Sequence, residues 1–504
     1  MARRERRARA HGAGRHQARR RRLVPGGGAL VGVLSRGAGF DDGERMVFTL
    51  VRCALLCVLL SLGLGALAAS YYLPELASLL QSLGLSLVQL RPLHTTFASA
   101  WIFLGAVTVV HKYLFDTFGA PTPGDRLRFR LQLVCWALAG LGILVTLPFG
   151  LTSGREYIGF HPAFSVLIAV GWVAFAVTFF SKVRHGFWSR PVYVYMWSVG
   201  ILFFLYTFAE GHAWLLPGVR SQPVADLQIQ WKSCGSLVAS FNQMVYGCVL
   251  YMGERVSRDK RLAQSRASFA LFGVGLLNSF TNSAHHTYHL PQSHAIKWVA
   301  FVVSMLEIII LYGVLREVLK RMSGPRRSTT DFSVAVRFVE LSKTWNLFLL
   351  VLALLISVPP LNALIHGTHV VMAHGMGSEL AIDTYILLGC FAFVLAELFP
   401  KREARAAYID NERARRTING LNASLALLVA WLVAGGLTTG ITRYLGQPRP
   451  DWLSSFPFVF AILGLSVAWF LVRLLWQWRP LLWRPAEHRN WYGLDDSGGE
   501  KRGA

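Results

Sequence analysis

Hydrophobic runs of about twenty residues recur along the whole chain, and they limit what it can fold into. Each run is long enough to cross the hydrocarbon core of a bilayer as a helix. Of the 504 residues, 53% are hydrophobic and 15% are charged, which is typical of a membrane protein rather than of several soluble domains. We therefore predict an all-α integral membrane protein with about twelve transmembrane helices. The predicted spans are 47–70, 92–115, 130–152, 163–182, 191–211, 229–253, 266–288, 297–318, 344–363, 368–398, 418–440 and 455–477.

The formal net charge of +24 is large enough to suggest a nucleic-acid-binding protein. The distribution of the charge argues against that function, because Lys and Arg gather in every second loop between the predicted spans. If the N-terminus lies in the cytoplasm, these loops all face the cytoplasm, as the positive-inside rule requires. We expect both termini to be cytoplasmic in a bacterial-type inner membrane, with lipid and not nucleic acid around the protein.

The two ends of the chain differ in composition from the part between them. Residues 1–45 are rich in Arg and then in Gly. They indicate a disordered cytoplasmic tail, or a start assigned too early with Met46 as the true start; a lipid- or nucleic-acid-binding arm is the alternative. The expected organisation is this basic extension, a membrane domain over 46–478 that carries the cofactors, and a cytoplasmic tail over 479–504.

The segment 361–380, LNALIHGTHVVMAHGMGSEL, is apolar enough for a membrane helix but carries His366, His369 and His374. An imidazole inside lipid is costly, so it indicates a functional site. His374 and Met376 are two residues apart and point to nearly opposite sides of one helix. Since both side chains can ligate haem iron, the spacing indicates two cofactors, one on each side. The alternative is that the histidines bond to carbonyl groups and Met376 is a packing residue.

Other predicted spans carry further polar groups. His94 begins the second span, His285 and His286 end the seventh, and Glu307 lies among apolar residues of the eighth. A carboxylate there must be paired, protonated or functional, and a hydrogen bond to a neighbouring helix is its alternative role. By the predicted topology, ten of the fifteen histidines lie on or near the outer side, which indicates a metal or haem layer there.

Several of these segments resemble the catalytic subunit I of the haem-copper oxidase superfamily, and cbb(3)-type cytochrome c oxidases most of all. LRPLHT, with His94, is similar to the segment that bears a low-spin haem histidine, and GREYIGF at 154–160 is similar to the next outer loop. The pair His285 and His286 is similar to the histidine pair that binds the non-haem metal. SMLEIIILY, with Glu307, resembles the nitric oxide reductases.

In the histidine-rich segment, His374 matches the family's high-spin haem ligand. Met376 stands where the family has a second histidine, the low-spin ligand, and His366 matches a histidine that lies near haem propionates. The resemblance covers most of residues 46–400. It implies two haems, which we expect to be b-type, with His94 and Met376 on the low-spin haem and His374 on the high-spin haem.

The chain departs from the family where the second metal is expected. Gly235 replaces a histidine ligand, Ala239 replaces a glutamate of the nitric oxide reductases, and Ser279 replaces a tyrosine of the cbb(3) oxidases. Two imidazoles alone do not complete a metal's ligand shell. We therefore expect the second metal, copper or non-haem iron, to be held weakly or not at all; Cys234 and His289 are the alternative ligands.

The resemblance implies an oxidoreductase of the cytochrome c oxidase or nitric oxide reductase type. Electrons would pass from a low-spin haem to a reaction site with His374, His285 and His286, where dioxygen or nitric oxide is reduced and Glu307 supplies protons. The chain has no Cys-x-x-Cys-His motif for a c-type haem, so cytochrome c or cytochrome- or copper-containing subunits must deliver the electrons. The alternatives are a non-catalytic haem membrane protein, acting as an electron conduit or sensor, and a transporter, which would have broken helices and mid-membrane polar groups.

Overall fold

The computed structural model describes residues 39–281, 284, 287–288, 290–323 and 332–489. The secondary structure of these residues is helical, apart from an isolated β-bridge between Thr152 and Phe160. The helices are α2 (Asp42–Ser70), α3 (Pro74–Ser82), α4 (Leu87–Phe118), α5 (Pro123–Thr146), α6 (Pro162–Val183), α7 (Val192–Glu210), α8 (Pro217–Arg220), α9 (Pro223–Ser257), α10 (Arg266–Thr281), α12 (His294–Met322), α13 (Ser333–Ser357), α14 (Pro359–Ile365), α15 (His369–Ser378), the π-helical η5 (Glu379–Thr384), α16 (Tyr385–Leu398), α17 (Arg402–Tyr408), α18 (Glu412–Leu445), α19 (Phe456–Trp483) and α20 (Pro485–Arg489), with short 3-10 turns between some of them.

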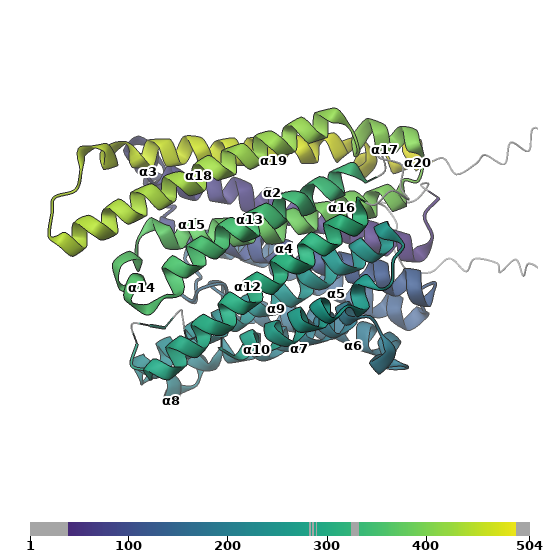
Figure 1. Ribbon diagram of the computed structural model, residues 1–504, viewed down its shortest axis with the longest axis horizontal. Helices are drawn as coiled ribbons and strands as arrows, with labels where there is room; N and C mark the ends of the chain where they lie inside the picture. The colour runs from purple at the N-terminus through teal and green to yellow at the C-terminus, as the bar shows by residue number, and fades with distance from the viewer. Residues whose placement is uncertain (1–38, 282–283, 285–286, 289, 324–331, 490–504) are drawn as a thin grey trace, which may run out of the picture. The chain divides into compact units, whose positions relative to one another are not determined.

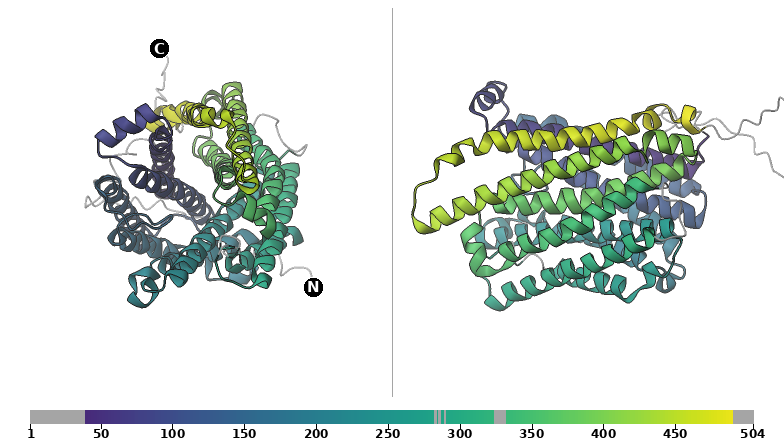
Figure 2. Two further views of the ribbon diagram at one scale, coloured as in Figure 1. Left: turned by 90° about the vertical axis from the view of Figure 1, so that its left-hand side faces the viewer. Right: turned by 45° about the horizontal axis from the view of Figure 1, so that its top comes forward.

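The long helices lie side by side in one bundle (Figures 1 and 2). Neighbours in sequence pack as pairs: α2 on α4, α5 on α6, and α18 on α19. The pair of α7 and α9 packs in the same way. We call the end of the bundle with α3, α8 and α14 the α14 end, and the end with α17 and α20 the α17 end (Figure 1).

Ten helices in the described part of the chain are long and apolar enough to cross a membrane, and the chain is an integral membrane protein. The two remaining predicted spans coincide with α9 and α10. α9 is 35 residues long, but its buried face carries Ser236, Ser240 and Gln243, which lower its hydropathy. Only 16 residues of α10 are described. The prediction of an all-α membrane protein with about twelve membrane helices is confirmed.

The helix ends differ from the predicted ends where local signals outweigh hydrophobicity. α5 begins at Pro123 and not at 130, because Thr122 and Asp125 form reciprocal capping hydrogen bonds of 3.1 and 2.9 Å. α13 ends at Ser357, because Pro359 and Pro360 cannot continue a helix. The predicted span 368–398 consists of α15, the π-helical η5 and α16.

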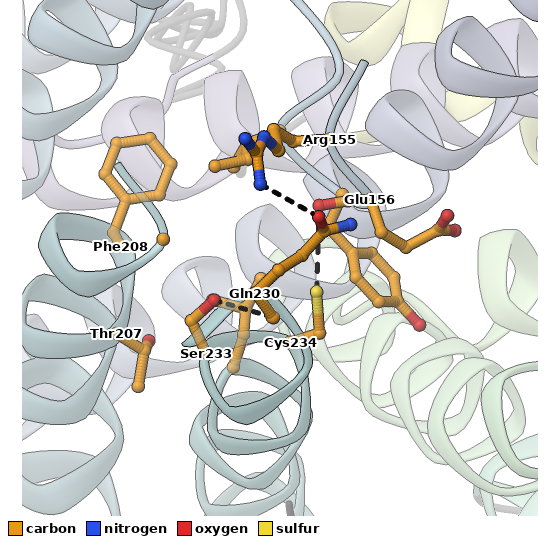
Figure 3. Close-up of a pocket in the computed structure, with 11 residues that line it drawn as sticks. Arg155, Glu156, Thr207, Phe208, Gln230, Ser233 and Cys234 are labelled. Carbon is orange, nitrogen blue, oxygen red and sulfur yellow. Dashed lines mark hydrogen bonds between the residues drawn. The ribbon is translucent and has the colours of Figure 1, made fainter. Parts of the chain in front are cut away.

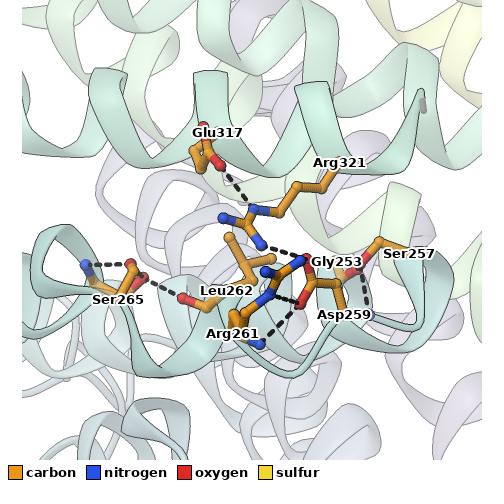
Figure 4. Close-up of polar contacts among 9 residues, drawn as sticks. Gly253, Ser257, Asp259, Arg261, Leu262, Ser265, Glu317 and Arg321 are labelled. Carbon is orange, nitrogen blue, oxygen red and sulfur yellow. Dashed lines mark hydrogen bonds and ion pairs between the residues drawn. The ribbon is translucent and has the colours of Figure 1, made fainter.

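At the α17 end, an ion-pair cluster joins the end of α9 to α12 (Figure 4). Asp259 accepts hydrogen bonds from the backbone and side chain of Arg261 at 3.0 and 3.1 Å, and it pairs with Arg321 of α12. Arg321 also contacts Glu317 at 2.7 Å. The hydrogen bonds from Arg261, together with the charge of Arg321, hold the pKa of the Asp259 carboxyl at about 2, below its ordinary value.

Candidate functional site

His94 lies near the beginning of α4, at the α14 end, with its ring against α2. Its Nδ1 is 2.8 Å from the backbone carbonyl oxygen of Ser61 and 3.2 Å from the Ser61 hydroxyl. The Ser61 hydroxyl in turn donates to the carbonyl of His94 at 3.3 Å. Since a carbonyl oxygen can only accept, Nδ1 carries the proton and Nε2 keeps its lone pair. A histidine that ligates a metal is held in the same way, by a second hydrogen bond that fixes its tautomer.

Gly65 on α2 provides the room for this ring. A Cβ atom at Gly65 would lie 2.6 Å from Nδ1 and 2.8 Å from Cε1 of His94. Gly63, two residues earlier, has no such neighbour, since a Cβ atom there would meet nothing within 4 Å. The close approach of the imidazole to α2 therefore depends on the glycine at position 65.

Three further predicted histidines, His366, His369 and His374, lie on or beside α15. His374 is within this helix, and its Nδ1 is buried without a hydrogen-bond partner. His369 is the first residue of α15, and its ring centroid lies 4.4 Å from that of Phe456. His366 lies in the exposed turn between α14 and α15, where its carbonyl accepts from Arg443 of α18 at 3.0 Å. A buried imidazole nitrogen without a partner, as in His374, is typical of a site that takes a further group.

Met376 is in the same α-helix as His374, so the two side chains leave α15 in nearly opposite directions, as predicted. Met376 is partly buried and packs against the apolar core. Between them, a Cβ atom at Gly375 would meet nothing within 4 Å.

His285 and His286, the predicted metal pair, and the alternative ligand His289 lie outside the described residues. The helices around the pair are described. The Ser236 hydroxyl of α9 donates to the Ser279 carbonyl of α10 at 3.0 Å, so these helices touch one residue beyond Gly235. In the residues that the structure describes, no group of three or more His, Cys, Asp and Glu side chains could hold a metal ion.

Cys234, an alternative metal ligand, points toward the loop over 152–160 (Figure 3). Its thiol donates to the Glu156 carbonyl at 3.8 Å. In the same loop, Glu156 forms an ion pair with Arg91 at 2.9 Å. Arg155 forms a bidentate pair with Asp226 of α9, with both distances 2.9 Å. The thiol and the two ion pairs tie the loop to the beginnings of α4 and α9.

Tyr157, in the same loop, was not among the predicted site residues. Its φ of +60° is unusual for a residue with a side chain, and its hydroxyl donates to Glu379 of η5 at 3.2 Å. Nearby, Gly159 packs closely on Pro92, where a Cβ atom would be 2.8 Å from the proline ring. The loop therefore joins the beginning of α4, which carries His94, to the π-helical η5 that directly follows α15 with His374 and Met376.

An apolar cavity of about 150 Å³ lies between α4, α5, α6, α7 and α9. Thr96 and Phe97, which follow His94 closely on α4, line it together with Leu237, which follows Gly235 on α9. Tyr157 and Phe208 line both this cavity and the small one beside Cys234 in Figure 3. The two predicted ligand regions on α4 and α9 thus border one apolar space.

Glu307 is buried in α12 and accepts a hydrogen bond from the amide of Asn278 on α10. The Ser304 hydroxyl donates to the other end of the same Asn278 side chain at 3.1 Å. A hydrogen bond to a neighbouring helix, the alternative that the sequence left open, is therefore present.

Three observations on the described residues are consistent with haem binding. His94 presents the unprotonated Nε2 that iron requires, Gly65 leaves space for the ring, and His374 has a buried nitrogen without a partner. Within the described chain, the histidines divide between the ends of the bundle as predicted. His94, His161, His212, His294, His366, His369 and His374 lie toward the α14 end, and His111, His185 and His488 toward the α17 end.

Comparisons with known proteins agree with this arrangement. A family model described as cytochrome C and quinol oxidase polypeptide I matches residues 45–457. The cbb3-type cytochrome c oxidase subunit CcoN1 of Stutzerimonas stutzeri is 22% identical over 342 residues, which are 64% of this chain and 69% of that protein. A haem-copper terminal oxidase dimer solved by cryo-electron microscopy has the same fold, with a TM-score of 0.65 at 11% identity over 87% of this chain and 84% of the matched chain. Because the family match extends over far more than half of the chain, and through the helices that carry His94 and His374, the chain belongs to the haem-copper oxidase subunit I family of membrane oxidoreductases, and is cbb(3)-like at low identity.

Proposed function

We propose that this chain is the haem-bearing catalytic subunit of a respiratory terminal reductase, similar to cbb(3)-type cytochrome c oxidases, which reduces dioxygen or nitric oxide. In this role His94 and Met376 hold a low-spin haem and His374 holds a high-spin haem. Bound haem supplies one-electron transfer and a coordination position for the gas. The orientation of His94 carries the proposal, because a hydrogen bond from Nδ1 to the Ser61 carbonyl leaves only Nε2 for a ligand.

The remaining predicted site residues take supporting roles. His285 and His286 would hold the second metal. Glu307, which accepts a hydrogen bond from Asn278 of α10, would hold a proton near the end of α10 that precedes this histidine pair in the sequence. His366, in the exposed turn before α15, would contact the haem propionates, as its match to the family's histidine implies. Apolar side chains around the cavity at Phe97 and Leu237 keep bulk water from this region.

Electron delivery needs other subunits. The sequence contains no Cys-x-x-Cys-His motif, so neither haem would be a covalently attached c-type haem, and we expect both to be b-type. A cytochrome c, or a cytochrome- or copper-containing subunit, would donate electrons at the α14 end, where the haem ligands lie.

The charge pattern supports an orientation in the membrane. Lys and Arg are concentrated in the loops of the α17 end, which would therefore face the cytoplasm of a bacterial-type inner membrane. Both termini then lie in the cytoplasm. The proposed organisation is a basic extension over 1–45, a haem-binding membrane domain over 46–478 and a cytoplasmic tail over 479–504.

A second candidate function is a non-catalytic haem protein, acting as an electron conduit or sensor. Gly235, Ala239 and Ser279 favour it, because none of these side chains can replace the family's metal ligand, glutamate or tyrosine. In that case the chain would keep both haems and lack the second metal.

Two measurements on purified protein test both proposals. A pyridine haemochrome assay with a carbon-monoxide difference spectrum should give two b-type haems per chain, one of which binds carbon monoxide. A protein without haem would contradict both functions. Metal analysis then separates them, because a catalytic two-metal site requires stoichiometric copper or non-haem iron and the conduit or sensor does not.

A further inference from the structure

In the described part of the chain, the last long helix, α19, has one face that no neighbouring helix covers. α19 lies at the edge of the bundle, where it packs on α18 and α2 (Figures 1 and 2). On its uncovered face, Trp469, Trp476 and Trp483 are 63%, 61% and 78% exposed, whereas Trp478 is buried. A spacing of seven residues is about two helical turns, so the three exposed indoles form one stripe along α19, which we call the tryptophan stripe.

The tryptophan stripe lies where α19 leaves the apolar part of the membrane at the α17 end. The segment Asp451–Trp483 is long and apolar enough to cross a membrane, and the span predicted from the sequence ends at 477. Trp476 is therefore at the end of the span, and Trp483 lies beyond it. Tryptophan is enriched at this depth, because its ring is apolar while its N–H reaches the polar headgroups. Trp469 is then placed to contact acyl chains, and the other two indoles to contact headgroups.

Two arginines flank the tryptophan stripe. Arg473 and Arg479 stand three residues before and three residues after Trp476, about 60° to either side of it around the helix. The Arg479 guanidinium lies over the Trp476 ring, 4.1 Å from its centroid. Within the described residues, neither arginine side chain forms an ion pair or a hydrogen bond, and α19 itself contains no acidic residue. Two positive charges at the edge of the hydrocarbon without a counter-ion favour an anion from outside the chain.

The neighbouring helix α2 supplies a third arginine at the same end of the bundle. Arg52 of α2 donates a hydrogen bond to the backbone carbonyl of Leu482, near the end of the tryptophan stripe. The acids at the beginning of α2 are already engaged, Asp42 by Arg45 at 3.0 Å and Glu44 by a capping hydrogen bond of 2.9 Å. The contact between α2 and α19 therefore has a net positive charge at the membrane surface.

Apolar side chains continue from these arginines toward the middle of the membrane. Leu56 of α2 and Leu465 of α19 are each 56% exposed. Together with Trp469, they give an apolar surface that begins directly below the guanidinium groups. A charged end and an adjoining apolar surface match the two parts of a phospholipid, its headgroup and its acyl chains.

We propose that the tryptophan stripe, with Arg473 and Arg479, is a binding site for an acidic phospholipid in the leaflet at the α17 end. The guanidinium groups donate hydrogen bonds to the phosphate oxygens, and the acyl chains lie along Trp469 and the exposed leucines. A zwitterionic lipid fits less well, because its own ammonium group offsets the charge of the phosphate. Haem takes no part in this site, so its test and that of the proposed function are separate.

Quenching of tryptophan fluorescence by brominated lipids tests the site on the purified full-length protein. The protein is reconstituted into phosphatidylcholine vesicles that contain a small, equal fraction of either brominated phosphatidylglycerol or brominated phosphatidylcholine. We expect the acidic lipid to quench more strongly, with a local preference of at least about fivefold. The double variant Arg473→Gln/Arg479→Gln should lose most of this preference. Trp476→Phe should remove part of the emission that the acidic lipid quenches.

Arg316→Gln/Lys320→Gln is the matched control. It removes the same charge from two exposed basic residues of α12 at the same end of the bundle, and it should keep the preference. An equal loss in the control would assign the preference to the general positive charge of this end and overturn the site. Equal quenching by the two lipids in the wild type would also overturn it. If Trp476→Phe left quenching by both lipids unchanged, lipid would not reach the tryptophan stripe, and a covering protein chain would replace the proposed lipid.

Discussion

The imidazole of His94 donates its Nδ1–H to the backbone carbonyl of Ser61 at 2.8 Å, across the contact between α4 and α2. This bond fixes both the ring plane and the tautomer of His94. The Ser61 hydroxyl also lies 3.2 Å from Nδ1. Gly65, one turn further along α2, leaves room for the imidazole ring. α2 has no ligand of its own in the proposed site, yet it determines which nitrogen of His94 faces a cofactor.

The first prediction concerns the space that Gly65 leaves. Gly65→Ala would place a Cβ atom 2.6 Å from Nδ1, so the His94 ring must move away from Ser61. We expect the variant to lose most of its low-spin haem, by the pyridine haemochrome assay and the low-spin absorption bands, while the carbon-monoxide-binding haem remains.

Gly63→Ala is the control, because a Cβ atom at that position meets nothing within 4 Å on the same helix. It should retain both haems. Equal haem content in the two alanine variants would show that the position of His94 against α2 does not govern haem binding.

The second prediction concerns Met376. If Met376 is the second axial ligand of the low-spin haem, near-infrared magnetic circular dichroism should show methionine–iron ligation, and Met376→Leu should abolish that signal. A thioether ligand also raises the haem potential relative to two imidazoles, so the wild type should have a high potential. Met372→Leu, one turn earlier on α15, is the matched control, since Met372 is likewise a partly buried residue that packs against the core.

A bis-histidine signature in the wild type would contradict this assignment, and His369 would then be the first residue to examine. Its ring lies 4.4 Å from Phe456 and its Nδ1 is buried without a partner, so it has a defined position beside α19. His369→Ala should leave the axial ligation unchanged if Met376 is the ligand.

The fold could be predicted from the sequence because hydrophobic runs and loop charges are local signals. Helix ends were less predictable, since α5 begins at a capping box and α13 ends before a pair of prolines. The setting of His94 could not be predicted, because Ser61 and Gly65 lie about thirty residues away on another helix, and only packing brings them to the ring.

Two acids at the site were missed although the sequence contained a signal. Glu379 and Asp383 stand four residues apart in the apolar run 368–398, where each carboxyl should indicate a functional group. The inward direction of Tyr157 depends on a φ of +60° in the loop, which the sequence does not reveal. Broken helices and mid-membrane polar groups are expected of a transporter, yet this member of the haem-copper oxidase subunit I family also has a π-helical turn with a buried acid, Asp383.

The third prediction concerns Gly235. If the second-metal site lacks only the histidine ligand that the family has at position 235, Gly235→His should supply it. The copper or non-haem iron content should then rise well above the wild-type level, measured by metal analysis at constant haem content. Gly235→Ala adds a side chain without a ligand and should not change the metal content. Stoichiometric metal in the unaltered protein, lost on His285→Ala, would be the opposite result and would require a ligand other than residue 235.

The fourth prediction concerns the ion-pair cluster at the α17 end, where Asp259 joins the end of α9 to Arg321 of α12. Because the pKa of Asp259 is held at about 2 in the folded protein, below the ordinary value, the unfolded chain binds a proton more readily. The stabilisation from Asp259 is therefore present at neutral pH and is lost as the pH falls from about 4 to about 2. Asp259→Asn should lower the thermal midpoint in detergent at neutral pH and flatten the decline of that midpoint over this acidic range.

Glu340→Gln is the control, because it removes an ion pair with Arg337 that lies within α13 alone. It should change neither the thermal midpoint at neutral pH nor its decline in acid. An equal effect of the two variants would mean that the Asp259 cluster does not hold α9 to α12.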